Sequence, residues 1–220
     1  MTAVTIGEGS FDVATPHGPA HVELLPASPC VGLLVLGHGA GGGIEAPDVL
    51  AAAEAGRGRR LAVARVLQPY RVAGRKAPPA AGRLDEAWAC VLGELTRRLP
   101  GTPQIHGGRS SGARVACRGA VVVDPAPVGV LALAFPLLAP ARKDGTRPDR
   151  SSEIDAVDAA GIPTLVVQGE RDRFGMPQPS GRRDVVPVAG DHSLRAKGPV
   201  ADAVGPWLDG LLPPASDPVG

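Results

Sequence analysis

Short, continuous hydrophobic runs alternate along this chain with segments of helical spacing. Each run is bounded by Gly, Pro or polar residues and is about as long as one strand, which is typical of strands buried on both faces of a sheet. We expect such strands at residues 31–36, 61–67, 128–135 and 163–169, with a last short one at 184–188. Residues 3–26 alternate loosely between apolar and polar positions instead, which predicts short antiparallel strands.

Apolar positions three and four residues apart predict the helices. The clearest pattern covers residues 84–99, where Trp88, Val91 and Leu95 share one side. Further helices are expected at residues 48–53, 111–118, 154–160 and 200–212. This alternation predicts an α/β fold, with a mostly parallel sheet and helices on both faces. A length of 220 residues predicts a single domain, residues 1–220.

Two long segments are expected to contain little regular secondary structure. Residues 69–82 are polar and rich in Pro and Gly, which predicts a long loop. Residues 136–163 are polar, Pro-rich and hold at most one short helix, so no large helical cap domain is expected over the fold. An open, shallow site follows, with Tyr70 and Arg71 at its border.

The composition argues against nucleic acid and membranes as binding partners. A formal net charge of +1 gives no general attraction to nucleic acid or to a membrane surface, and 3% aromatic residues predict no base-stacking platform. No uncharged apolar run approaches the ~20 residues of a membrane helix. The cysteines, Cys30, Cys90 and Cys117, are odd in number and form no C-x-x-C pair, and the first residues show no signal-peptide pattern. We therefore expect a reducing, cytoplasmic location.

The main chemical pattern is Gly108-Arg109-Ser110-Ser111-Gly112, which reads G-x-S-x-G between an expected strand and an expected helix. In such a turn the glycines let the strand and the helix approach, and the serine hydroxyl projects out of the fold. The N–H of Ser111 begins the helix, where it can donate to an oxyanion. A Gly-rich loop can match the pattern by chance, so the interpretation of Ser110 as a nucleophile depends on its partners.

A serine needs a base and an acid to become nucleophilic. His192 is the expected base, because it lies in a Gly-bounded loop between the last strand and the last helix. Asp172 is the expected acid, since it follows a buried strand at its carboxyl end, and Glu170 is the alternative. Ser110, Asp172 and His192 occur in the nucleophile–acid–base order of α/β-hydrolases.

The other histidines are dispersed. His106 is expected inside a strand, and His17 and His21 lie in the N-terminal region. No clustered Cys/His spacing occurs, so neither a metal site nor a cofactor is expected.

A Gly-rich loop at residues 37–43 follows the first buried strand and precedes a helix. A phosphate-binding loop is the alternative interpretation, but no Lys follows the glycines, and the next strand ends in Gln68-Pro69 rather than in an acidic residue. Small residues in an oxyanion loop let a backbone N–H reach a substrate oxygen. Ala40 is our first choice for this donor and Gly41 the second, beside the N–H of Ser111.

Together the segments at residues 36–41, 107–114, 167–175 and 190–194 resemble the α/β-hydrolase superfamily. They look most like its compact dienelactone-hydrolase-like branch, which also includes the hydrolase-like domain of an acetyltransferase-complex subunit. Residues 68–71, 75–79 and 134–137 are similar to that branch as well. The sequence departs from it in two ways: the nucleophile is Ser rather than the Cys of dienelactone hydrolases, and Leu138 stands where a polar residue is expected.

The resemblance implies an α/β-hydrolase fold, with Ser110 as nucleophile, His192 as general base and then acid, and Asp172 as the group that orients it. The expected activity is that of a serine hydrolase that cleaves the ester or thioester of a small-molecule acyl substrate through an acyl-enzyme. Two alternatives stay open: a hydrolase-like binding or scaffold module with little turnover, and an acyltransferase that uses the same acyl-enzyme.

Overall fold

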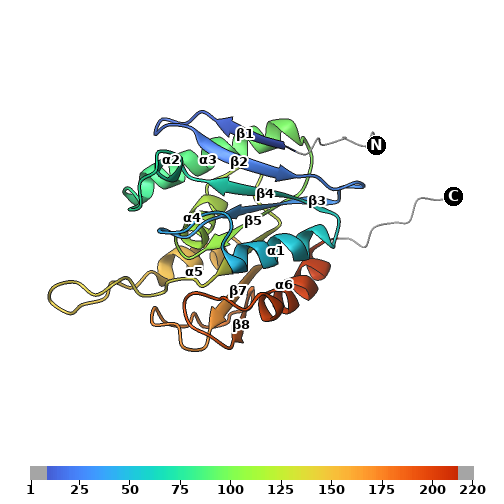
Figure 1. Cartoon of the computed structure of the whole chain (residues 1–220). Helices are drawn as coiled ribbons and strands as arrows, with labels where there is room; N and C mark the ends of the chain where they lie inside the picture. Colours follow the sequence, from blue (N-terminus) through green and yellow to red (C-terminus); the bar gives the residue numbers. More distant parts are fainter. Residues whose placement is uncertain (1–8, 213–220) are drawn as a thin grey trace.

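A computed structural model describes residues 9–212, and its strands form one sheet in the order β1-β2-β4-β3-β5-β6-β7-β8 (Figure 1). The strands are β1 (Gly9–Val13), β2 (Ala20–Leu25), β3 (Gly32–Gly37), β4 (Leu61–Leu67), β5 (Gln104–Arg109), β6 (Gly129–Leu133), β7 (Thr164–Gly169) and β8 (Arg183–Val188). β1 and β2 pair antiparallel, as do β2 and β4, whereas every pairing from β4 across to β8 is parallel. The expected antiparallel start and parallel remainder are confirmed, although Val4 and Ile6 of that start lie outside the described residues.

Helices cover both faces of the sheet, as expected. They are α1 (Pro47–Arg57), α2 (Pro69–Val72), α3 (Ala81–Arg98), α4 (Ser111–Ala120), α5 (Ser151–Ala159) and α6 (Lys197–Leu211). α1 and α6 pack together on one face, and α3, α4 and α5 cover the other. Among the helices of residues 9–212, none is long and apolar enough to cross a bilayer.

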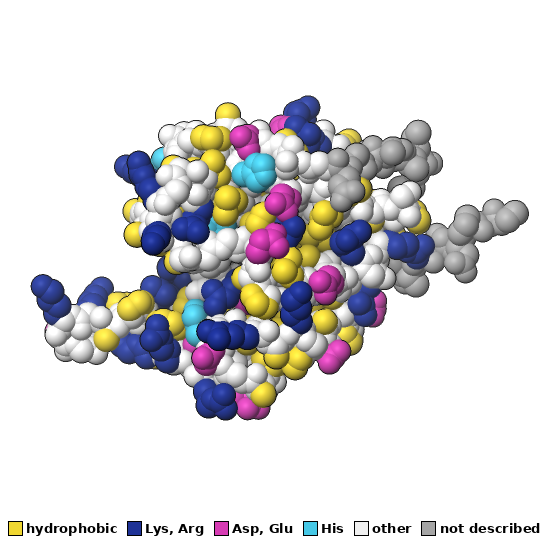
Figure 2. Space-filling view, in the orientation of Figure 1, with side chains coloured by type: hydrophobic (Ala, Val, Ile, Leu, Met, Phe, Trp, Pro, Cys, Tyr) yellow, Lys and Arg dark blue, Asp and Glu magenta, His cyan; other side chains and the backbone are white. Residues whose placement is uncertain are grey.

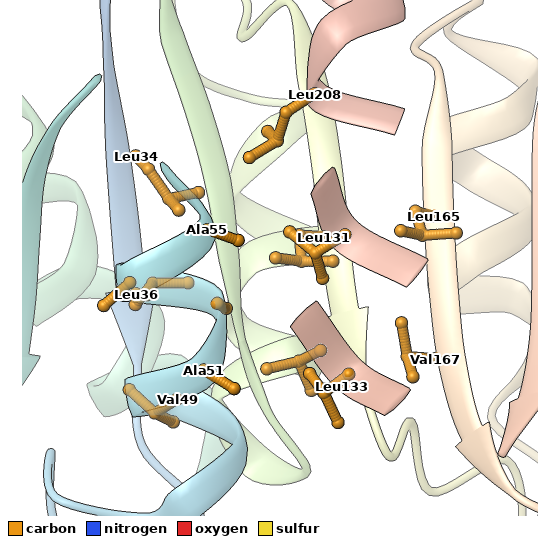
Figure 3. Close-up of a cluster of buried hydrophobic side chains, with 14 of the residues drawn as sticks. Leu34, Leu36, Val49, Ala51, Ala55, Leu131, Leu133, Leu165, Val167 and Leu208 are labelled. Carbon is orange, nitrogen blue, oxygen red and sulfur yellow. The ribbon is translucent and has the colours of Figure 1, made fainter. Parts of the chain in front are cut away.

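The hydrophobic runs are central strands, and their burial explains their composition. All six residues of β3 are buried because its side chains alternate between two covered faces. On the face of α1 and α6, Leu34 and Leu36 of β3 belong to one buried cluster with Leu131 and Leu133 of β6 and Leu208 of α6 (Figure 3). Small alanines of α1 let this helix lie close to the strands.

The parallel register brings the strand ends that matter to one edge. Gly37 of β3 pairs with Gly108 of β5, and Arg109 of β5 pairs with Leu133 of β6. Gly169 of β7 in turn pairs with Val188 of β8. The segments that follow β3, β5, β7 and β8 therefore leave the sheet from the same edge, where open α/β sheets bind their ligands.

The structure corrects the sequence prediction over residues 69–82, which were expected to be loop throughout. Residues 69–72 form the one-turn helix α2, and α3 already begins at Ala81. Pro69 opens the turn of α2, where its missing N–H costs no hydrogen bond.

The strand expected at residues 128–135 is shorter and covers Gly129–Leu133. The segment between β6 and α5 extends away from the rest of the molecule (Figure 1), and residues 136–163 contain α5 as their one helix, so the expected absence of a large cap is confirmed.

Candidate active site

Ser110 occupies a sharp turn between β5 and α4. Its φ of 51° and ψ of −108° lie in a region that side chains rarely adopt, which costs on the order of 1–3 kcal/mol. The N–H of Ser110 donates to the carbonyl of Leu133 at 2.8 Å, which holds the turn against β6. Although Ser110 precedes α4, its hydroxyl does not cap that helix, so it is free to point elsewhere.

Two glycines make the turn possible by close approach. A Cβ on Gly108 would lie 2.7 Å from the backbone carbonyl carbon of Gly112, and a Cβ on Gly112 would lie 2.5 Å from the backbone of Gly37. These distances are far below a van der Waals contact, so β3, β5 and α4 can meet here only without side chains. The G-x-S-x-G spacing is thus a packing requirement of this junction.

His192 and Asp172 meet Ser110 in space although they are far from it in the sequence. The Nε2 atom of His192 lies 2.9 Å from Ser110 Oγ, and its Nδ1 atom lies 2.8 Å from Asp172 Oδ2. Because a carboxylate only accepts, the Nδ1–H tautomer is the one that satisfies both contacts, and it leaves the Nε2 lone pair facing the serine hydroxyl.

Asp172 is held as an acceptor on both oxygens. Its side chain is 1% exposed. The N–H of Phe174 donates to Oδ1 at 2.9 Å, and Nε2 of the buried Gln168 lies 2.8 Å from Oδ2. Glu170, the alternative acid, is exposed. The structure thus brings Asp172 rather than Glu170 to the imidazole.

Two residues that the sequence analysis did not single out hold the histidine loop. The ring of Phe174 meets the His192 ring edge-on, with 4.6 Å between centroids. Arg109 donates from Nη2 to the carbonyl oxygen of His192 at 3.0 Å, and its Nε lies 3.0 Å from Oδ2 of the fully buried Asp48. Burial raises the pKa of Asp48 to about 6 even though the Arg109 charge opposes this shift.

The Gly-rich loop after β3 lies against the same turn. A Cβ on Gly39 would lie 2.5 Å from Nη1 of Arg109, so the loop passes directly over this guanidinium. Ala40 is half-buried and Gly41 is exposed, while Ser111 is the first residue of α4. The three expected oxyanion donors therefore belong to a loop and a helix end that meet beside Ser110.

Two side chains fix the peptide groups of this loop. His38 Nδ1 lies 2.8 Å from Gly39 O, and the N–H of Gln68 donates to His38 Nε2 at 3.0 Å. Burial lowers the pKa of His38, and the neutral ring suits a site where one nitrogen donates and the other accepts. The Tyr70 hydroxyl donates to Ala40 O at 2.7 Å. Since a peptide group is planar, fixing these two carbonyls also fixes the N–H groups of Ala40 and Gly41.

The remaining histidines lie apart from this site. His106 is buried inside β5, as expected, and burial lowers its pKa to about 4. His17 and His21 pair with Glu86 and Asp12. Among residues 9–212, no three His, Cys, Asp or Glu side chains gather as metal ligands would.

Leu138, the unexpected apolar residue, donates its N–H to the carbonyl of Phe174 at 2.8 Å.

Several solved structures resemble this one in fold. An α/β serine hydrolase homologue from Coxiella burnetii aligns with a TM-score of 0.74 at 17% identity, covering 93% of this chain and 99% of its own. A lid-less α/β serine hydrolase from Xanthomonas campestris aligns at 0.72 and 19%, covering 98% and 100%. A dienelactone hydrolase from Anabaena variabilis aligns at 0.72 and 16%, covering 94% and 99%.

A search of curated proteins finds none that matches this chain. The family model described as an alpha/beta hydrolase domain, however, matches residues 31–197. This match covers most of the chain and spans the Gly-rich loop, the serine turn and the segments that carry Asp172 and His192. With its dienelactone-hydrolase-like fold, the chain belongs to the α/β-hydrolase family.

Proposed function

We propose that this chain is a serine hydrolase that cleaves a carboxylic ester or thioester through an acyl-enzyme. The observation that carries the proposal is the hydrogen-bonded series from Asp172 through His192 to Ser110, with 2.8 and 2.9 Å between successive atoms. The strained turn that presents Ser110 supports it, because strained backbone conformations cluster at functional residues.

In the proposed reaction Nε2 of His192 accepts the hydroxyl proton while Ser110 Oγ attacks the substrate carbonyl carbon. The resulting tetrahedral intermediate breaks its bond to the leaving alcohol or thiol, which takes the proton from the imidazolium. A water molecule then attacks the acyl-enzyme, with His192 again as base, and releases the acid and the free serine. Asp172 keeps the ring in the required tautomer and stabilises its charged form.

The oxyanion of both intermediates needs backbone donors. We propose the N–H of Ser111 and that of Ala40, with Gly41 as the alternative to Ala40. The hydrogen bonds of His38 and Tyr70 to the loop carbonyls support this role, since they fix the donors before substrate arrives.

Covalent labelling with a fluorophosphonate tests the proposal. The wild-type protein should be labelled on Ser110 and should turn over p-nitrophenyl acetate, and Ser110→Ala should lose both properties. Ser111→Ala is the matched control, because it removes a neighbouring hydroxyl and keeps the backbone N–H. Labelling on Ser111, or full turnover by Ser110→Ala, would contradict the proposal. An unlabelled, inactive wild type would favour the binding or scaffold module instead.

We also propose a cytoplasmic protein that acts on small acyl substrates. Cys30, Cys90 and Cys117 form no disulfide, which fits a reducing compartment.

Product analysis with an added alcohol acceptor separates hydrolysis from acyl transfer: free acid alone supports the hydrolase, and a new ester as the main product supports the acyltransferase.

A further inference from the structure

A cavity of about 580 Å³ lies beside α2, between the first turn of α3 and the turn that joins β1 to β2. Its volume is within the range of small-molecule sites. Proline and alanine side chains form much of its wall, and Tyr70 and Leu84 close its inner side. Neither Ser110 nor His192 lines it, so the proposed reaction does not account for it.

Two arginines of this wall carry positive charge. Arg75 and Arg83 both line the cavity, and among the described residues neither guanidinium has a hydrogen-bond or ion-pair partner. The nearby acids of α3 are already engaged: Glu86 pairs with His17, and Asp85 pairs with Arg118. Two unpaired guanidinium groups on one cavity are suited to bind a carboxylate or a phosphate.

Gln68 lines the cavity and is itself almost completely buried. Gln68 is 6% exposed, and its amide Nε2 donates to the carbonyl of Leu84 at 3.3 Å. Its Oε1 atom is buried and accepts no hydrogen bond from the described residues. This oxygen is enclosed by protein atoms, so the remainder of Gln68 is what lines the cavity.

The wider surface has the same sign of charge. Lys and Arg side chains gather on the side of the molecule where the parallel strands end (left in Figure 2). The first turn of α3 contains no acidic residue, and no side chain caps it. An anion that approaches the cavity therefore meets neither carboxylates of this helix turn nor a competing cap.

We propose that this cavity binds a small organic anion, with a carboxylate or phosphate head on Arg75 and Arg83 and an apolar body against the proline and alanine side chains of the wall. The binding does not depend on the proposed hydrolase activity. Tyr70 links the two places, because its ring lines the cavity while its hydroxyl holds the Ala40 carbonyl.

NMR titration of the full chain labelled with ¹⁵N tests the proposal. The probes are 4-hydroxybenzoate, 4-hydroxyphenyl phosphate and the uncharged 4-hydroxybenzamide. We expect saturable shifts of the Gln68 side-chain amide with at least one of the two anions, and the anion that binds tells whether a carboxylate or a phosphate head is preferred. Arg75→Gln/Arg83→Gln should weaken this binding at least 10-fold. Arg182→Gln is the control, because it removes another exposed arginine far from the cavity.

Three outcomes would overturn the proposal. One is the absence of saturable shifts with both anions at concentrations up to 10 mM. Another is equal binding by 4-hydroxybenzamide, which would remove the role of charge. The third is equal affinity in the double variant and the wild type. Both arginines are exposed and unpaired, so the double variant should fold, and its thermal unfolding checks this.

Discussion

The guanidinium of Arg109 donates to the backbone carbonyl of His192 across 3.0 Å, although 83 positions separate the two residues. The same group lies against Asp48 at the start of α1 and under Gly39 of the Gly-rich loop. One side chain thus joins the segments that carry the proposed nucleophile, base and oxyanion donors. We expect its effect on the proposed reaction to be positional, because it contacts the proposed base only through the backbone.

Replacing Arg109 should therefore impair turnover more than binding. We expect Arg109→Gln to lower kcat for p-nitrophenyl acetate about 10- to 100-fold with little change in KM, since displacements of about 1 Å have effects of that order. Arg114→Gln is the matched control, because Arg114 of α4 pairs with Glu153 of α5 and does not contact the histidine loop. Equal kcat values in the two variants would refute the positioning role.

Removing the hydroxyl of Tyr70 should loosen the oxyanion loop. Loss of a direct oxyanion donor costs roughly 10²–10³ in kcat, and we expect about 10-fold from Tyr70→Phe, which only frees the Ala40 carbonyl. The rate of fluorophosphonate labelling should fall in parallel, because its adduct also places an oxygen in the hole. A variant with unchanged labelling and turnover would show that the loop keeps its geometry without this bond.

The acid can be assigned by a pair of isosteric variants. Asp172→Asn should lower kcat by on the order of 10⁴, because an amide no longer selects the Nδ1–H tautomer. Glu170→Gln should leave kcat unchanged, since Glu170 is exposed and makes no contact with His192. Steady-state kinetics of the two variants side by side give the answer, and the reverse pattern would mean that the acid is Glu170.

The sequence could not choose between these two acids for a physical reason. Both follow the same buried strand, and a difference of one residue in the path of the loop would exchange them. The N–H of Phe174 and the side chain of Gln168 fix that path by bonding to Asp172. Gln168 is held in turn by the carbonyl of Phe135, 33 positions away, and such a contact depends on tertiary packing rather than on local pattern.

More of the fold than of the site could be predicted. Buried strands such as β3 and β7 can be recognised in the sequence by their continuous apolar runs. The glycines around Ser110 are required because the backbones of β3, β5 and α4 approach closely there. By contrast, Arg109 occupies a position where the motif allows any residue, and its partners lie 61 and 83 positions away. The turn α2 was missed because four residues are too few to show a helical period.

The buried His106 should make stability depend on pH. Burial lowers its folded-state pKa to about 4, whereas an unfolded histidine titrates near ~6.5, so between these values the unfolded chain binds more protons. The contribution of His106 to the free energy of unfolding is fully present above about pH 6.5. It is lost as the pH falls toward 4, and the total loss is up to about 3 kcal/mol. His106→Phe removes this term, while Asp48, whose raised pKa opposes it, stays in both proteins.

Denaturant unfolding at pH 7 and at pH 4 measures this difference. The wild type should lose more unfolding free energy between the two pH values than His106→Phe does. Phe keeps an aromatic ring against Trp88, which meets the imidazole edge-on, so packing is nearly matched. Parallel losses in the two proteins would mean that His106 accepts its proton without unfolding.

The length of the acyl group should have little effect on catalysis beyond short chains. α5 buries Ile154 and Val157 against α4 and the sheet, so it is packed as part of a layer. The segment before it extends away from the molecule (Figure 1). Tyr70, the expected border residue, is turned toward the Ala40 carbonyl. No described element therefore forms a deep apolar tunnel over Ser110.

An open site buries little of a long chain, and burial contributes about 0.8 kcal/mol per CH₂. We therefore expect kcat/KM for p-nitrophenyl esters to be flat or to fall beyond about four to six carbons, because added methylenes stay in water. Measurements from two to twelve carbons, below the micelle concentration of each ester, test this expectation. A steady rise of about fourfold per CH₂ would correspond to full burial, and would show that a tunnel forms around the acyl group when substrate binds.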